Sequence, residues 1–295
     1  MSMNVTSRRS EFLPFLLVLF TGALLAALIA PKGLELFGYG GMTLEAILAR
    51  PEVGVGRSLL LSQGLYALFM FLLPALFLYQ RWHDGRVASL LQPSWSALDS
   101  LLAWIILPAL LPALNACNSL WVGAAHGMDF MAPHFEAQAQ SALAVDRMLF
   151  MPTWVDHAAS ILVFVVLAAF SEEFLFRASL QRFLHGQAKP FMAILGATIA
   201  FTIGHMNFIQ WPFLVGAGFT LGLVYYLSGR LWISFGAHLI HNGLTYYWTQ
   251  EAGPNAYGTM EEVLPFWIIL CGLIIALSAG WLLIKRHAPK PHRAA

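Results

Sequence analysis

The sequence predicts an all-α, polytopic transmembrane helical bundle with about eight spans. Of its 295 residues, 59% are hydrophobic and only 11% are charged, whereas a soluble domain carries about 25% charged residues. The mean hydropathy is +0.69. Apolar stretches recur at about the 20 residues needed to cross a hydrocarbon core. They must be helices, because a backbone in lipid has to satisfy its own hydrogen bonds.

Eight apolar stretches define the expected spans. The first follows Arg8 and Arg9 and ends without a small-residue cleavage site, so we interpret it as a retained span and not as a signal peptide. Tight connections at 210–212 and 228–230 predict that three successive helices are antiparallel neighbours. The expected spans are residues 12–30, 59–79, 97–117, 157–177, 190–209, 211–229, 231–249 and 264–284.

Two long segments, 31–58 and 118–156, lie between spans on the side opposite the N-terminus. Each carries apolar side chains among polar ones, with Leu44, Ile47 and Leu48 at helical spacing in the first. One interpretation is an amphipathic helix lying on the membrane surface. The other is an ordered loop that caps the bundle, and we favour this second interpretation.

The distribution of Lys and Arg predicts the orientation of the chain. If the N-terminus is inside, 12 of the 16 Lys and Arg residues fall on the inner side, which is the bias of a cytoplasmic face. Both termini are then cytoplasmic, and we expect a single membrane domain over residues 1–295. These 12 residues are Arg8, Arg9, Arg81, Arg86, Arg177, Arg182, Lys189, Arg230, Lys285, Arg286, Lys290 and Arg293.

The same features predict where the protein is found and with what it associates. We expect a multi-pass protein of the cell membrane, in a bacterium the inner membrane, with the lipid bilayer as its surroundings. The net charge is +1, and no basic patch with interleaved aromatic residues suggests a nucleic-acid partner.

Charged residues interrupt the fourth expected span. Glu172, Glu173 and Arg177 follow a nearly pure apolar run, and an ionisable residue inside a membrane span is a functional hypothesis by default. Glu173 and Arg177 are four residues apart on one helix face, so we expect them to pair and leave Glu172 facing a cavity. The groups reach similar depths only if this helix continues past Arg177, to about Leu184.

Two further spans carry candidate catalytic side chains. His205 lies in the fifth, and His238 and Asn242 share one face of the seventh. A glutamate with a histidine can activate water as a general base. A second histidine and an amide can donate hydrogen bonds to a developing oxyanion. The alternative for the whole set is a polar network that holds helices together.

These residues resemble the family of CAAX prenyl proteases and bacteriocin-processing enzymes (CPBP or Abi family). Its motifs are E-E-x-x-x-R, F-x-x-x-H and H-x-x-x-N, which correspond to Glu172-Glu173-x-x-x-Arg177, Phe201-x-x-x-His205 and His238-x-x-x-Asn242. The resemblance covers about residues 157–249, which we take as the catalytic core.

The resemblance implies a role for each motif residue. Glu172 and His205 would activate the attacking water, and His238 and Asn242 would form the oxyanion hole. Glu173 and Arg177 would support the site. The family implies a glutamic-type intramembrane endopeptidase without a required metal, acting on a membrane protein or peptide. Its prenylated substrates cannot be carried over to this chain, because many relatives cut other substrates.

Two alternatives stay open at this point. The first is a zinc peptidase that uses the same carboxylate and two imidazoles; no other cofactor is expected, and zinc is not favoured because its ligands would come from three separate helices. The second is not an enzyme. It is a membrane partner or immunity protein, or a transporter with a proton-linked Glu/His relay, although no half-repeat typical of a transporter is visible.

Overall fold

The computed structural model describes residues 12–83, 95–254 and 264–287, and within these ranges all regular structure is helical. The predicted all-α fold class is therefore confirmed. Six helical segments are long and apolar enough to cross a membrane, and these are Leu13–Leu36, Val53–Arg81, Ala97–Ala125, Trp154–His185, Phe208–Ser228 and Phe266–His287.

The other two expected spans are also helices but do not meet that standard. Helix α12 (Pro190–Gly204) has 15 residues, which gives about 22 Å of length at 1.5 Å per residue against a hydrocarbon core of about 30 Å. Helix α14 (Leu231–Ala252) has 22 residues but carries two histidines and an asparagine in its middle turns.

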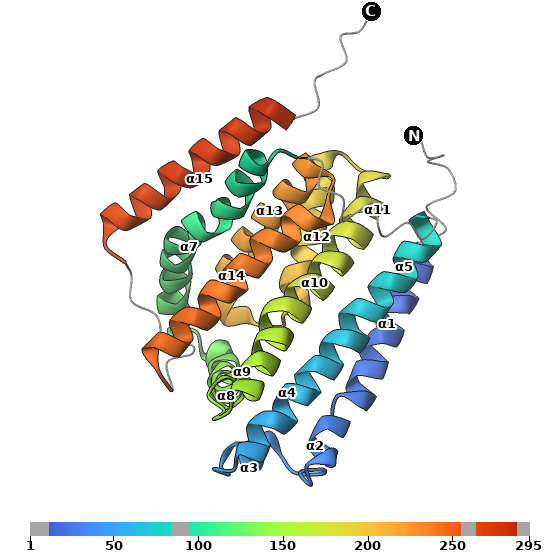
Figure 1. Cartoon of the computed structure of the whole chain (residues 1–295), viewed down its shortest axis with the longest axis vertical. Helices are drawn as coiled ribbons and strands as arrows, with labels where there is room; N and C mark the ends of the chain where they lie inside the picture. The colour runs from blue at the N-terminus through green and yellow to red at the C-terminus, as the bar shows by residue number, and fades with distance from the viewer. Residues whose placement is uncertain (1–11, 84–94, 255–263, 288–295) are drawn as a thin grey trace, which may run out of the picture.

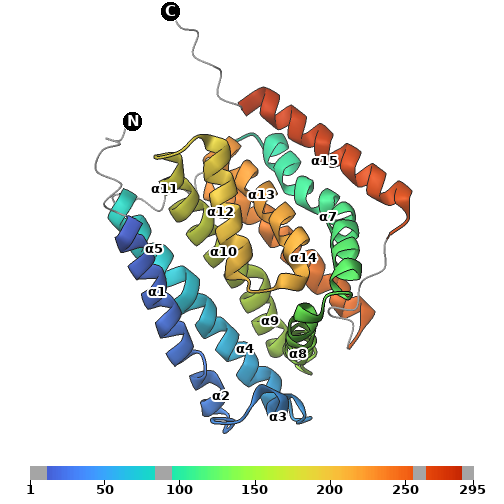
Figure 2. The same ribbon diagram turned by 180° about the vertical axis from the view of Figure 1, so that it is seen from behind.

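Two helical layers enclose the central helices (Figures 1 and 2). One edge is a hairpin of α1 (Phe12–Ile29) and the long helix formed by α4 (Val53–Ala67), η3 (Leu68–Leu72) and α5 (Leu73–His83). The opposite edge is the pair α7 (Ala97–Ala125) and α15 (Phe266–His287). The start of α1 and the end of α15 lie toward the same end of the bundle in both views.

A charged contact ties α15 to α7. Arg286 Nη1 lies 2.5 Å from Asp99 Oδ1, and His287 Nε2 lies 3.2 Å from Asp99 Oδ2. Asp99 stands in the first turn of α7, whose N-cap is Ser96. A carboxylate there also meets the positive end of the helix dipole, so this contact fixes the two helix ends together.

The two long connecting segments form short helices against the bundle and are not loops. They contain α2 (Lys32–Leu36), α3 (Leu44–Leu48), η4 (Asp129–Met131) and α8 (Ala132–Leu149). Met148 and Met151 pack into a buried cluster with Ile47 and Val55. The preferred expectation of a loop is therefore wrong in secondary structure, because apolar side chains at helical spacing could be buried against α4.

A salt bridge anchors the start of the next helix. Thr153 and Asp156 form a capping box, in which each side chain accepts from the other residue's backbone N–H. Arg57 of α4 donates to both carboxylate oxygens of Asp156, at 2.7 and 2.9 Å. Bidentate Arg–carboxylate pairs are geometrically specific, so this pair sets where the fourth long helix begins.

That helix runs without a break from Trp154 to His185. It consists of α9 (Trp154–Ser160), η5 (Ile161–Leu167), α10 (Ala168–Glu173), η6 (Phe174–Gln181) and α11 (Arg182–His185). The expectation that it continues past Arg177 is confirmed. Both η5 and η6 are π-helical, and π-helical turns are frequent at functional sites.

The fifth expected span ends earlier than predicted. Helix α12 stops at Gly204, His205 is its C-cap, and Met206 adopts a left-handed φ of 50°. A turn and η7 (Phe208–Gln210) then lead into α13 (Trp211–Ser228), with Pro212 in its first turn. The expected turn at 210–212 is therefore displaced to 205–210, and His205 lies in that turn and not inside a span. The second connection, at Gly229 with φ 61°, is tight as predicted.

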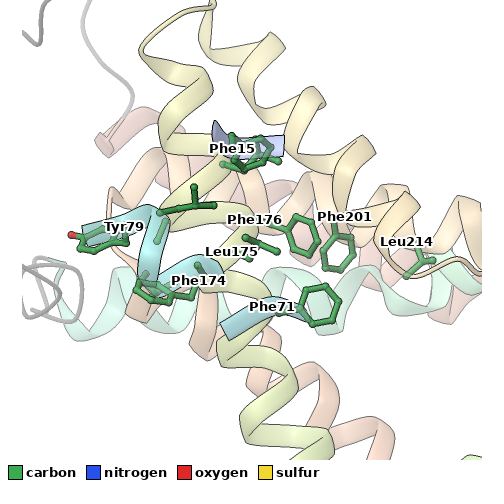
Figure 3. Close-up of a cluster of buried hydrophobic side chains, with 13 residues drawn as sticks. Phe15, Phe71, Tyr79, Phe174, Leu175, Phe176, Phe201 and Leu214 are labelled. Carbon is green, nitrogen blue, oxygen red and sulfur yellow. The ribbon is translucent and has the colours of Figure 1, made fainter. Parts of the chain in front are cut away.

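Aromatic packing surrounds the segment that follows Glu173. Phe174, Leu175 and Phe176 belong to a buried cluster that also includes Phe71 and Phe201 (Figure 3). The rings of Phe176 and Phe201 meet edge to face at 5.4 Å between centroids. Such pairs contribute about 0.5–1.5 kcal/mol beyond their burial, so they hold η6 against α12.

Glycines on α13 permit the close approach of its neighbours. A Cβ added at Gly222 would lie 3.0 Å from both Gln181 Oε1 and Ile194 Cγ2, and one at Gly218 would lie 3.0 Å from Phe201. A Cβ at Gly216 would clash with Leu114. Small residues of this kind are typical of helix interfaces in membranes.

We predict that Gly222→Leu lowers the free energy of unfolding by about 1–3 kcal/mol, because overpacking displaces η6 and α12. The matched control is Gly280→Leu on α15, where no atom lies within 4 Å of the added Cβ. Thermal unfolding of both variants in the same detergent is the measurement. Equal midpoints for the two variants would contradict this packing.

Candidate active site

Three separate elements position the predicted site residues. Glu172 and Glu173 end α10 and Arg177 lies on η6, in the same long helix. His205 lies in the turn after α12, and His238 lies in α14. The side chains of Glu173 and Arg177 are 0% exposed, whereas those of Glu172 and His205 are 13% and 28% exposed. The two adjacent glutamates therefore occupy different environments.

A buried ion pair forms the base of the site. Arg177 Nε lies 3.4 Å from Glu173 Oε2, as the i,i+4 spacing predicted. The guanidinium also donates to the Gly218 carbonyl at 3.3 Å and lies over the Phe201 ring, 4.9 Å from its centroid. A buried charge is tolerated only with such partners, so α12 and α13 both help to hold it.

Glu173 also fixes the imidazole of His238. Its Oε1 lies 3.1 Å from His238 Nδ1. Because Glu173 is paired with a guanidinium, its carboxylate is ionised and only accepts hydrogen bonds. His238 therefore donates from Nδ1, and its Nε2 points toward Glu172 Oε2 at 3.9 Å.

His205 has a parallel arrangement. Its Nδ1 lies 2.8 Å from the Phe201 backbone carbonyl, and a carbonyl oxygen only accepts. The Nδ1 atom therefore carries the hydrogen, and Nε2 faces Glu172 Oε2 at 3.6 Å. The Nε2 atoms of both histidines thus converge on one oxygen of Glu172.

That oxygen of Glu172, like Oε2 of the adjacent Glu173, is buried without a hydrogen-bond donor among the described residues. The distances of 3.6 and 3.9 Å to the two imidazoles are longer than a direct hydrogen bond. Burying a carboxylate oxygen without a donor is costly, so this oxygen is chemically available to a ligand.

Asn242 lies one helical turn beyond His238 on α14. Its Nδ2 donates to the Phe164 carbonyl of η5 at 3.1 Å. The structure thus brings Glu172, Glu173, Arg177, His205 and His238 together through contacts with one another, and the hydrogen bond of Asn242 goes to the backbone instead. Its role at the oxyanion stays a prediction.

Several backbone contacts that hold the site were not predicted from the sequence. The carbonyl of Gly218 binds Arg177, and the carbonyl of Gly222 accepts from Gln181 Nε2 at 2.8 Å. The carbonyls of Phe201 and Phe164 orient His205 and Asn242. The four-residue spacing of Phe201 and His205 could have indicated the contact between the Phe201 carbonyl and His205. No residue type signals the others, because any residue supplies a carbonyl.

No group of three or more His, Cys, Asp or Glu side chains in the described part of the chain has the arrangement to hold a metal ion. The donor set of Glu172, His205 and His238 is nevertheless chemically of the kind that binds zinc.

The helices of the described residues define a polytopic membrane protein. Residues 154–244 match the family model described as "Type II CAAX prenyl endopeptidase Rce1-like", a segment of about a third of the chain that contains every predicted site residue. This match supports the resemblance of the segment to the CAAX prenyl proteases and bacteriocin-processing proteins, and with it a peptidase activity in general. Searches among curated proteins and among solved structures gave no match.

We predict that Arg177→Met destabilises the protein by about 3–5 kcal/mol, because Glu173 is then buried without its cation. The double variant Glu173→Gln/Arg177→Met is expected to recover much of this loss, since it buries no unpaired charge. Urea unfolding in a fixed detergent measures the difference. A double variant as unstable as the single one would show that the pair is not coupled in this way.

Proposed function

We propose that this protein is a glutamic-type intramembrane endopeptidase that hydrolyses a peptide bond of a membrane-associated protein or peptide. One observation carries the proposal. The Nε2 atoms of His205 and His238 face the same oxygen of Glu172, at 3.6 and 3.9 Å, while their Nδ1 atoms are held by other partners. The match of residues 154–244 to a protease family model supports the same reaction class.

Glu172 and His205 are suited to hold the attacking water. A neutral His205 with its hydrogen on Nδ1 presents a lone pair at Nε2, so it and the carboxylate of Glu172 are both acceptors. Two acceptors 3.6 Å apart suit one water molecule that donates a hydrogen bond to each. The water is thereby oriented, and Glu172 is in reach to take its proton.

The bond changes then balance without a cofactor. The water oxygen attacks the scissile carbonyl carbon as one proton passes to Glu172, and the carbonyl oxygen becomes an oxyanion. The tetrahedral intermediate collapses, the C–N bond breaks, and Glu172 returns the proton to the leaving amine. Glu172 thus acts first as general base and then as general acid.

His238 is suited to stabilise the oxyanion only in its imidazolium form. Its Nδ1–H is committed to Glu173, so Nε2 becomes a donor when it also carries a proton. Asn242 keeps a second Nδ2 hydrogen besides the one given to Phe164, and we assign it the other donor position. Donors aimed at a developing oxyanion are usually the largest catalytic term.

We further propose that both termini are cytoplasmic and that the membrane is a bacterial inner membrane. The excess of Lys and Arg on one side supports this orientation, and the ends of α1 and α15 lie toward the same end of the bundle. Prenylated substrates are not part of the proposal, because the site geometry involves only the peptide bond.

Catalytic zinc is the second candidate, and one observation favours it. Zinc-bound histidines usually donate their other ring N–H to a carboxylate or a carbonyl, which is the arrangement of both histidines here. The first candidate is preferred because no described cluster is arranged to hold a metal ion and because the water can be activated without one.

We predict that Glu172→Gln lowers the rate of peptide cleavage by about 10²- to 10⁴-fold while the protein stays folded in the membrane, because the amide cannot accept the proton. His205→Ala is also expected to lower the rate of peptide cleavage. The matched control is Glu45→Gln, an exposed glutamate on α3. Cleavage by purified variants in lipid nanodiscs is the readout, and full activity of Glu172→Gln would refute the proposal.

We also predict that cleavage survives exhaustive treatment with a zinc chelator and that the active protein contains no stoichiometric zinc. Elemental analysis and cleavage assays on the same preparation test this. The zinc mechanism would be established instead by two results together. Chelation would abolish the activity of the wild type and added Zn²⁺ would restore it, and His205→Ala would bind no metal.

A further inference from the structure

A cavity of about 370 Å³ lies beside the proposed catalytic residues and takes no part in the mechanism described so far. It is bounded by α7, α8, the η7–α13 junction and α14. Its volume is within the range of ligand pockets in proteins.

The side chain of His241 connects this cavity to the site. His241 lines the cavity, and its ring centroid is 6.3 Å from that of His238. Phe213 also lines the cavity, and its ring centroid lies 5.6 Å from that of His241. A peptide held in the cavity would therefore be one side chain away from His238, which is close enough to continue into the proposed site.

Polar and apolar groups both line the cavity, and the apolar part is the larger. No Asp, Glu, Lys or Arg belongs to the lining, which includes the imidazoles of His126 and His241. The apolar residues are Leu111, Val122, Phe135, Ile209, Phe213 and Trp248. Amide and hydroxyl groups reach it from every bounding element, and they belong to Asn115, Asn118, Gln138, Gln210, Thr245 and Thr249.

Two of the lining side chains have buried atoms that no described residue satisfies. These are Asn118 Oδ1 and His241 Nδ1. A buried polar atom without a partner costs about 1–3 kcal/mol. Both side chains would therefore be stabilised if they turned these atoms toward a hydrogen-bonding ligand in the cavity.

We propose that this cavity is a substrate subsite that binds polar, uncharged residues next to the scissile bond, of the kind of Ser, Thr, Asn and Gln. As a substrate subsite it rests on the proposed peptidase function. Gln138 and Thr245 already have partners within the protein, but an isoprenyl or acyl chain would offer none to the amide of Asn118. A hydrogen-bonding site rejects such a ligand strongly. A charged side chain would be buried without a counter-ion.

The test uses the full-length protein in nanodiscs and a charge introduced into the cavity. A randomised peptide library is cleaved, and the new termini are sequenced by mass spectrometry. The wild type is expected to select polar, uncharged residues on one side of the cut. Asn118→Asp is expected to increase the selection of Lys and Arg at that position by about tenfold.

The matched control is Gly123→Asp on the same helix, an exposed position that does not line the cavity and has open space around its Cβ. It should leave the selection unchanged. Equal shifts in both variants, no shift in Asn118→Asp, or preferential cleavage of a farnesylated peptide over its unmodified match would each overturn the subsite.

A binding measurement separates this inference from the catalytic one. Fluorescent peptides of equal length built from Ser and Gln, from Leu, or from Lys are titrated onto the Glu172→Gln variant. The Ser/Gln peptide should bind best, and adding Asn118→Leu should weaken it about tenfold. If the wild type cleaves nothing but this pattern holds, the peptidase proposal fails and the polar binding site stands. If cleavage occurs without the pattern, the peptidase proposal stands and the polar subsite fails.

Discussion

The buried ion pair between Glu173 and Arg177 is the constraint on which the rest of the site depends. Both side chains are fully buried, so the surrounding helices must supply every partner of the two charges. The Gly218 carbonyl, the Phe201 ring and His238 do so from α13, α12 and α14. The glycines of α13 make that approach sterically possible. The pair thus determines how three helices meet α10.

The same pair explains how two adjacent glutamates differ in chemistry. Glu173 is paired with Arg177 and orients His238, whereas Glu172 Oε2 faces the Nε2 atoms of His205 and His238 at 3.6 and 3.9 Å. The helix changes from α to π directly after Glu173. Within this π-helical segment Arg177 contacts both its carboxylate partner and the Gly218 carbonyl. The result is one structural and one reactive carboxylate within two residues.

Much of the site could be predicted from the sequence because it depends on local spacing and on the cost of charge in lipid. The i,i+4 relation of Glu173 and Arg177, the continuation of their helix and the close packing at Gly222 all follow from such rules. The end of α12 at Gly204 could not be predicted, because Met206, Phe208 and Ile209 continue the apolar run beyond it. The carbonyl partners and the cavity depend on contacts between distant segments, which no local pattern encodes.

The most direct test of the account is comparative terminal proteomics of membranes that contain equal amounts of wild-type protein or the Glu172→Gln variant. The account predicts a defined set of new protein termini with the wild type that vanish with the variant, because water activation by Glu172 creates them. Identical termini in both membranes would contradict the assignment of Glu172 as the catalytic base.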